Sequence, residues 1–327
     1  MRRLNLILGL IAAVLFALSA LAGTAPLGLG ETVAALAGQG EEGARVIVWE
    51  IRLPRAAAAV CVGAAQGLAG AALQGLLQNP LAAPGVLGVS ACSALGAVIA
   101  IFFGFAALSS LAVPVAAILG AGAATLILGL SALRGAGSVT LLLIGIGLSS
   151  FAGALMSLAL NLAPNPFSLA DLVNWMMGSV ANRSWADVLL AAPVWLAGAA
   201  LVVMSGPGLR VLSLGEETAL SLGADPRRLS LMVIAGTSLL TGASVAIAGM
   251  IGFVGIVAPH VIRPLVRHDP QRLLAPSALL AGIILTGADL AVRTAPFDQE
   301  LKLGVAAALL GGPVFIWIAA RLGRAGA

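Results

Sequence analysis

The chain has 327 residues, of which 60% are hydrophobic and only 9% are charged, and its mean hydropathy is +1.09. A soluble domain carries about 25% charged residues, so this composition excludes a soluble globular protein and indicates a polytopic membrane protein. The sequence pI is near 10.4. Because the basic residues are scattered at the ends of apolar runs and form no patch, we expect no nucleic-acid partner.

Apolar runs along the chain predict ten membrane-spanning helices, since lipid offers no hydrogen-bond partner for a free backbone. They lie at 4–23, 56–77, 89–106, 111–133, 138–162, 186–206, 228–249, 252–266, 272–292 and 303–321. The first run also resembles a signal peptide, but its length favours an uncleaved helix. The run at 252–266 is short and carries Pro259 and Pro264, so a broken or partly re-entrant helix is the alternative there.

The basic residues also predict the orientation of the spans. Most of the 17 Lys and Arg residues fall on the inner side when the N-terminus is placed in the cytoplasm, so both termini are predicted to be cytoplasmic. Two longer segments, 24–55 and 163–185, then lie outside. In the second, residues 169–178 predict a short helix near the outer surface, where Trp175 and Trp185 suit the membrane–water interface.

Several chemistries have no candidate residues in this chain. Lys302 is the only lysine and no phosphate-binding loop surrounds it, so the chain is not expected to hydrolyse ATP. The two histidines, His260 and His268, have no second metal ligand nearby, and the two cysteines show no metal spacing. We therefore predict a transport subunit, with no enzymatic activity, no metal site and no cofactor.

Asp289 is the one acidic residue that could couple transport to an ion gradient, as in a secondary transporter. It stands four residues before Arg293 on the same predicted helix. An i,i+4 ion pair is the favoured interpretation, and an ion-gradient-coupled carrier is kept as the alternative function.

The segment at 51–90 predicts a tightly packed helix followed by a turn. Gly63 and Gly67 have the spacing that lets membrane helices approach closely. Gln66 and Gln74 are the polar residues of this helix, and either a pore-facing or an interhelical role fits them. "QNPLAAPG" at 78–85 has two prolines and a glycine, and it predicts a tight cytoplasmic turn.

This segment and three later ones resemble the FecCD-type permeases of ABC importers, in the order of that family. The later segments are "GEETALSLGAD" (215–225), "AGMIGFVGIVAPHVIRPLVRHDPQRLLAPSALLAGIILTGADLAVR" (248–293) and "ELKLGVAAALLGGPVFIW" (300–317). The resemblance covers nearly the whole chain. One departure is Leu301-Lys302-Leu303, where the family often has Leu-Pro-Val or a similar sequence; this puts the turn before the last helix in doubt.

The resemblance implies an all-α type II importer permease, with residues 1–327 forming one transmembrane domain of about ten helices. It implies a homodimer in the bacterial inner membrane that works with two ATP-binding-cassette ATPase subunits and one periplasmic binding protein. The implied cargo is a metal chelate. A ferric siderophore is placed first, and haem and cobalamin stay open.

The resemblance also implies that the polar loop at 212–226 forms coupling helices that sit in a cleft of the ATPase subunit. The predicted coupling residues are Gly215, Glu216, Glu217, Ala219, Leu220, Leu222, Gly223 and Ala224. Their chemistry fits, since acids favour a helix N-terminus, leucines offer apolar contact and glycine can end the helix.

Two further sites follow from the resemblance. Arg52, Arg55 and Arg293 match the positions that receive glutamates of the binding protein; ordinary interfacial anchoring is the alternative. The translocation path is expected along the dimer axis, lined mainly by the fifth span, the third span and the outer helix. The candidate path residues are Gln66, Gly145, Gly147, Ser149 and Ser150.

Overall fold

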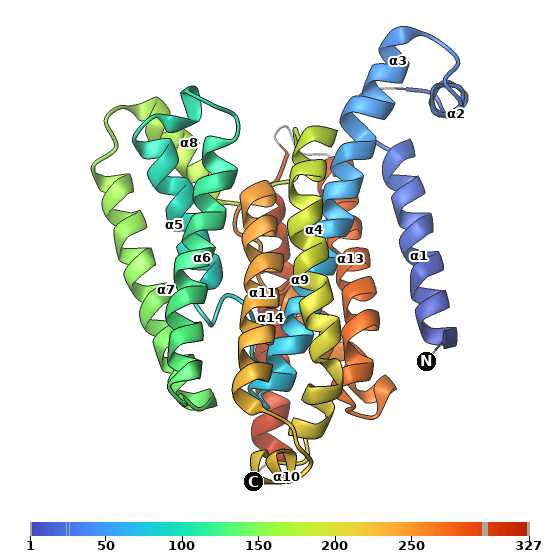
Figure 1. Cartoon of the computed structure of the whole chain (residues 1–327). Coiled ribbons are helices and arrows are strands. Elements are labelled where there is room, and N and C mark those ends of the chain that lie inside the picture. Colours follow the sequence, from blue (N-terminus) through green and yellow to red (C-terminus); the bar gives the residue numbers. More distant parts are fainter. Residues whose placement is uncertain (1, 24, 26, 296–299, 326–327) are drawn as a thin grey trace.

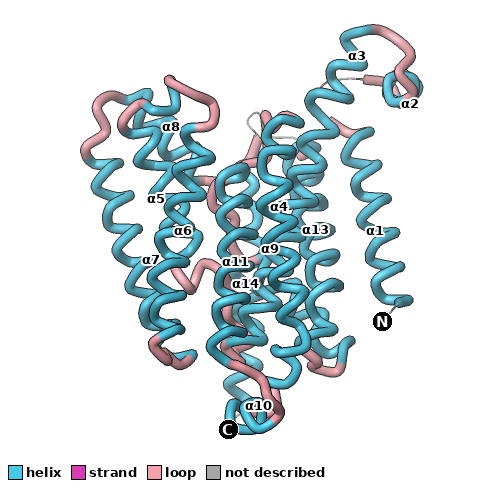
Figure 2. Tube along the Cα trace, in the orientation of Figure 1, coloured by secondary structure: helices cyan, strands magenta, loops and turns pink. Residues whose placement is uncertain are grey.

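The computed structural model describes residues 2–23, 25, 27–295 and 300–325. Every regular element in these ranges is a helix (Figures 1 and 2). The long helices run roughly side by side as a bundle. Figure 1 shows α2, α3 and α8 at one end and α10 at the other. Both chain termini lie toward the α10 end (Figure 1).

The helices fall into long and short groups. The long ones are α1 (Arg2–Leu21), α4 (Leu53–Leu76), α6 (Ala112–Leu133), α7 (Ser138–Asn161), α9 (Trp185–Leu212), α11 (Pro226–Ala248), α13 (Pro270–Thr294) and α14 (Leu303–Ala325). The shorter ones are α2 (Leu29–Leu36), α3 (Glu42–Val46), α5 (Val89–Phe102), α8 (Pro166–Met176), α10 (Glu216–Ser221) and α12 (Val254–Ile262). Three tighter or wider turns complete the set: the π-helix η1 (Ile47–Arg52) and the 3₁₀ turns η2 (Phe105–Ala107) and η3 (Arg263–Val266).

The predicted all-α class with about ten spans is confirmed. In the described residues, 7 helices are long and apolar enough to cross a membrane, and three shorter apolar helices occupy the remaining predicted positions. One predicted boundary was too short: α9 continues six residues beyond 206 to Leu212, through Pro207.

The span predicted at 252–266 is wrong as a complete crossing. α12 has 9 residues, a length of about 14 Å, whereas the hydrocarbon core of a bilayer is about 30 Å thick. It begins after Phe253, whose φ is 66°, and passes into the 3₁₀ turn η3 before Arg267. The alternative of a broken helix describes this segment.

The helix that contains α4 starts well before Pro54, whereas the sequence predicted a span that begins at residue 56. Helix runs without a break from Glu42 to Leu76, so the 24–55 segment is not a simple outer loop. Pro54 has no N–H to donate to the preceding turn, and the backbone takes up this loss in the wider π-turns of η1. The extra helical turns extend beyond the rest of the bundle in Figure 1.

α4 packs closely against α13 and α12 through its glycines. A Cβ atom on Gly63 would lie 2.5 Å from the carbonyl oxygen of Ala281, and one on Gly67 would lie 2.4 Å from the Ser277 oxygen. A Cβ on Gly70 would lie 1.8 Å from the oxygen of Gly255 in α12. The predicted close helix contact at Gly63 and Gly67 is confirmed.

We expect Gly70→Ala to destabilise the fold, because α4 and α12 must separate to admit a methyl group. The expected loss is about 1–3 kcal/mol of unfolding free energy. It is measured as a lower melting temperature of the detergent-solubilised protein by tryptophan fluorescence. Gly153→Ala on α7 is the matched control, since no atom lies within 4 Å of its added Cβ. Equal melting temperatures for the two variants would contradict the close contact.

Candidate translocation and coupling sites

A cavity of about 340 Å³ lies within the bundle between α4, α7 and two non-helical segments. Gln66 of α4 and Ser149 of α7 both line it. The remaining walls come from residues 83–86 with the first turn of α5, and from residues 250–253 with the first turn of α12. We call this cavity the chamber.

The connection from α4 to α5 forms one wall of the chamber, so the prediction of a tight cytoplasmic turn at 78–85 is wrong. After Leu76 the chain turns at Gln78, whose side-chain amide donates to the Leu212 carbonyl over 2.7 Å. It then returns into the bundle, where Leu87 is 1% exposed. Figure 2 shows this loop at mid-height in the bundle. Non-helical backbone at membrane depth is tolerated where it is buried in protein or lines a cavity.

The structure brings together three of the five predicted path residues. The Ser149 hydroxyl donates to the Gly85 carbonyl over 3.1 Å, in the chamber that Gln66 also lines. Gly145 is buried against the same connection, and a Cβ there would lie 2.5 Å from the Leu87 Cα. Gly147 and Ser150 do not line the chamber and lie on exposed parts of α7.

Sequence reasoning missed the two loops that complete the chamber. Pro84 and Gly85 in one, and Gly249 and Gly252 in the other, interrupt otherwise apolar segments. Such interruptions point to discontinuous helices around a binding site. This signal was present in the sequence. It was interpreted as a surface turn in the first case. In the second case it was placed at the junction of the spans 228–249 and 252–266, with a broken or partly re-entrant helix as the alternative for 252–266.

The two glutamines of α4 have different roles. The Arg263 guanidinium donates to the side-chain oxygen of Gln74, and Gln74 is 1% exposed. Gln74 therefore takes the interhelical role, whereas Gln66 lines the chamber.

The polar segment at 212–226 forms a protruding loop with one short helix, α10, at the end of the bundle where both termini lie (Figure 1). α10 begins after Gly215, whose φ of 103° favours glycine. Glu216 and Glu217 occupy its first turn, where the helix dipole favours acids. It ends at Gly223 (φ 80°), with the Ala224 N–H bonded to the Ala219 carbonyl over 2.9 Å.

α10 presents an apolar surface to its surroundings. Ala219 is 1% exposed and fixes α10 to the bundle. Leu214, Leu220 and Leu222 are 62%, 57% and 63% exposed. We call these three leucines the α10 tip. Leu220 lies on α10, and Leu214 and Leu222 lie in the turns just before and after it. Exposed apolar side chains on such a short polar segment mark an interaction surface, and Leu214 was not among the predicted coupling residues.

The three arginines predicted for docking lie at the opposite end, and two of them are buried. Arg52 is 3% exposed and donates to the carbonyls of Leu21 and Ala25 over 2.7 and 2.9 Å, so it caps the end of α1. Arg293 is 6% exposed and donates to the Ser19 carbonyl over 2.7 Å. Neither presents a free guanidinium, and neither is an ordinary interfacial anchor.

Arg55 and Arg293 meet at Asp289. The Arg55 guanidinium donates hydrogen bonds of 2.7 to 3.2 Å to both carboxylate oxygens of Asp289. It also forms an ion pair with the Glu300 carboxylate. Arg293 approaches Asp289 at 3.5 Å, which confirms the i,i+4 ion pair predicted from the sequence. The side chain of Asp289 is 1% exposed. This carboxylate is thus held between two arginines and ties α4 to α13.

No metal centre emerges from the described part of the chain, where no three His, Cys, Asp or Glu side chains are placed to hold an ion. Taken together, the helical bundle, the loop-lined chamber and the protruding α10 define a polytopic membrane permease.

Comparison with known proteins gives the family. The sequence model of the FecCD transport family matches residues 10–321, and the chain belongs to this family. It is 41% identical over 285 residues to the "Uncharacterized ABC transporter permease protein YvrB" of Bacillus subtilis (strain 168), covering 86% of this chain and 80% of that protein. It is 42% identical over 281 residues to the "Vitamin B12 import system permease protein BtuC" of Vibrio cholerae, covering 84% and 83%.

A solved structure agrees with the fold. A chain described as an inward-facing conformation of a transporter assigned to the metal-chelate ABC type superposes with a TM-score of 0.88. The sequences are 30% identical, and the match covers 98% of this chain and 100% of that one. The predicted family, the importer permease fold and the assignment as a transport subunit rather than an enzyme are confirmed.

Proposed function

We propose that this chain is the permease subunit of an ABC importer that carries a metal chelate across the bacterial inner membrane. It works as a homodimer with two ATPase subunits and a periplasmic binding protein, and both of its termini are cytoplasmic. The observation that carries the proposal is the α10 tip, an exposed apolar surface on a permease whose sequence has no nucleotide-binding loop. Energy must then enter through a partner, and the tip is the surface suited to receive it.

The predicted coupling residues fit this role in two groups. Leu220 and Leu222 supply contact area for the ATPase subunit, together with Leu214. Gly215, Glu216, Glu217, Ala219, Gly223 and Ala224 shape α10 and hold it to the bundle. Movement of α10 is transmitted through α9 and α11, the helices on either side of it in the chain.

The chamber is the proposed site where the cargo is bound within the membrane. Its lining is mostly apolar, with a few polar groups such as Gln66 and Ser149. A surface of this kind holds a bulky chelate weakly, and transport requires weak or multiple contacts.

The end of the bundle opposite α10 is the proposed docking face for the binding protein. Of the three predicted arginines, Arg55 is the one in contact with an exposed partner, Glu300. A glutamate of the binding protein would dock by replacing Glu300 at the Arg55 guanidinium, which can donate two parallel hydrogen bonds to a carboxylate. Arg52 and Arg293 would support this face from within.

Two cargo classes are supported by different observations. The sequence resemblance places a ferric siderophore first, while the relative named as a vitamin B12 import permease supports cobalamin; haem is the third member of the class. The similar structure is described as a metal-chelate type transporter, which is consistent with all three of these cargoes.

The test is reconstitution. Proteoliposomes that contain this chain and its ATPase partner, loaded with ATP, are expected to import chelate delivered by the cognate binding protein. Cyanocobalamin, a ferric siderophore and haem are compared in parallel. Liposomes with the chain alone and an ion gradient are the control, and uphill import in that control would instead favour the ion-coupled carrier.

A further inference from the structure

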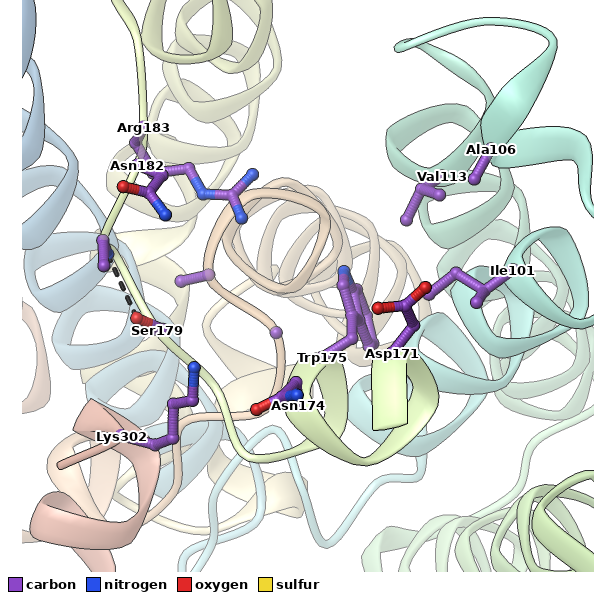
Figure 3. A pocket seen from close by; sticks show the side chains of 13 residues that line it. Ile101, Ala106, Val113, Asp171, Asn174, Trp175, Ser179, Asn182, Arg183 and Lys302 are labelled. Atoms are coloured by element: carbon purple, nitrogen blue, oxygen red, sulfur yellow. Dashed lines mark hydrogen bonds between the residues drawn. The ribbon is translucent and has the colours of Figure 1, made fainter. Parts of the chain in front are cut away.

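A second cavity, of about 370 Å³, lies beside α8 at the end of the bundle opposite α10. Its walls come from α8, from the α8–α9 connection, from the end of α11 and from Lys302 before α14, and an apolar side is added by α5, η2 and α6. We call it the α8 pocket. Figure 3 shows Arg183 and Lys302 entering from one side, with Asp171 and Trp175 on the other.

The lining of the α8 pocket has an excess of positive charge. Arg183 and Lys302 face one carboxylate, that of Asp171, and the amides of Asn174 and Asn182 add neutral donors. Within the described residues, none of the salt bridges includes Arg183. Because the two cations outnumber the one carboxylate, the pocket is suited to a ligand that supplies an anionic oxygen, which accepts charge-assisted hydrogen bonds from both.

The pocket is held open by close backbone contacts beneath it. The Ser179 N–H donates to the Ala248 carbonyl over 2.8 Å, and the Gly304 N–H donates to the Gly178 carbonyl over 3.1 Å. A Cβ on Gly178 would lie 2.3 Å from the Met250 oxygen. These contacts join the α8–α9 connection to the ends of α11 and α14, so the charged side chains stand on a fixed frame.

The α8 pocket and the chamber share one short stretch of chain. Ala248 and Gly249 line the pocket, and the next residues, Met250 and Ile251, line the chamber. The two cavities therefore adjoin along residues 248–251.

We propose that the α8 pocket binds an anionic oxygen group, a carboxylate or a phosphate, on one arm of the chelate before the chelate enters the chamber. This inference rests on the proposed function. Arg183 offers a planar fork and Lys302 a point charge, while Trp175 gives an apolar face for the adjoining atoms. Asp171 repels the anion at the opposite wall and so directs it toward the two cations. The volume fits a small arm, since ligand pockets span about 300–1,000 Å³.

An anionic group of the cargo is favoured as the ligand of the α8 pocket over an acidic side chain of the binding protein. The pocket adjoins the chamber, whereas the predicted docking arginines lie on η1, α4 and α13. Those arginines already have partners of their own, which are backbone carbonyls for Arg52 and carboxylates for Arg55 and Arg293. Lys302, the one lysine of the chain, lines this pocket.

The test measures binding of radiolabelled citrate and of inorganic phosphate to the full chain in lipid nanodiscs by equilibrium dialysis. Arg183→Gln and Lys302→Gln are each expected to weaken binding of the anion about tenfold, the effect of losing one charge-assisted hydrogen bond. Lys302→Arg keeps the charge and is expected to retain binding within about threefold. Trimethyl citrate, which is neutral, is expected not to compete.

Arg45→Gln is the matched control, because Arg45 is an exposed arginine on α3 at the same end of the bundle. It is expected to leave citrate binding unchanged. Equal affinity of the wild-type chain, Arg183→Gln and Lys302→Gln would overturn the assignment. So would variants that lose capture of the binding protein while citrate binding is kept, since the pocket would then serve that partner.

ATP-driven chelate uptake is measured on the same preparations to separate the two proposals. If uptake by the wild-type complex succeeds and the citrate result is negative, only the pocket assignment fails. If the wild-type complex shows no uptake with any chelate, the proposed function fails, whatever the anion binding.

Discussion

Leu220→Glu is expected to abolish functional docking of the ATPase subunit while leaving the permease folded. Leu220 is 57% exposed at the α10 tip, so a carboxylate there is solvated in the isolated chain and costs the fold little. In the complex the same carboxylate would be buried in an apolar cleft without a partner, which is unfavourable. Interface hot spots are worth about 2–4 kcal/mol, so affinity should fall by about thirtyfold to a thousandfold.

The measurement is co-purification of the ATPase subunit with the tagged permease, followed by chelate-stimulated ATP hydrolysis in proteoliposomes. Leu108→Glu is the matched control. Leu108 is 81% exposed in the α5–α6 connection, at the end of the bundle opposite α10 (Figure 1). This control receives the same new charge and should keep both ATPase capture and hydrolysis. If Leu220→Glu kept both as well, the α10 tip could not be the coupling surface.

The features that could be predicted from the sequence are those that depend on residues close together in the chain. Hydropathy located the spans because each apolar run must satisfy its own backbone within the bilayer. The termini of α10 were readable in the same way, from Gly215, the two glutamates that follow it and Gly223, since capping depends on a few adjacent residues. The i,i+4 relation of Asp289 and Arg293 was also a local property.

The remaining features depend on contacts between distant segments, which a single sequence does not display. Arg55 and Asp289 are 234 residues apart, and nothing in either local sequence indicates that the guanidinium of one holds the carboxylate of the other. The three arginines were interpreted as surface residues because arginines at span ends usually are. Two of them, Arg52 and Arg293, are buried because the end of α1 packs against η1 and α13.

The chamber illustrates the same limit. Gln66 and Ser149 were recognised as polar residues on membrane helices, but the loops that complete the cavity were not. Residues 83–86 and 250–253 are apolar or small, so their composition alone does not distinguish a surface turn from a re-entrant wall. Their role depends on the return of the α4–α5 connection into the bundle, where its end at Leu87 and Gly88 packs against Gly145 and Leu148 of α7.

Asp289→Asn is expected to destabilise the protein severely, because it leaves the buried Arg293 without a counter-charge and leaves Arg55 with Glu300 alone. Asp289 is the shared partner of Arg55 and Arg293 and is 1% exposed. Removing one member of a buried ion pair typically costs about 3–5 kcal/mol. The expected result is a large fall in melting temperature and in the yield of folded protein.

Glu300→Gln is the control for that variant, since Glu300 pairs with the same guanidinium at a site where its side chain is 31% exposed. Exposed ion pairs contribute about 0–1 kcal/mol, so this variant should melt close to the wild-type protein.

The comparison of Asp289→Asn with Glu300→Gln also distinguishes an ATP-driven permease from an ion-coupled carrier. An ion-coupling acid must take up and release its ion in each cycle, so replacing it would stop transport and leave the fold stable. A stable Asp289→Asn protein that had lost gradient-driven transport would support the carrier, whereas an unstable one supports a structural carboxylate in an ATP-driven permease.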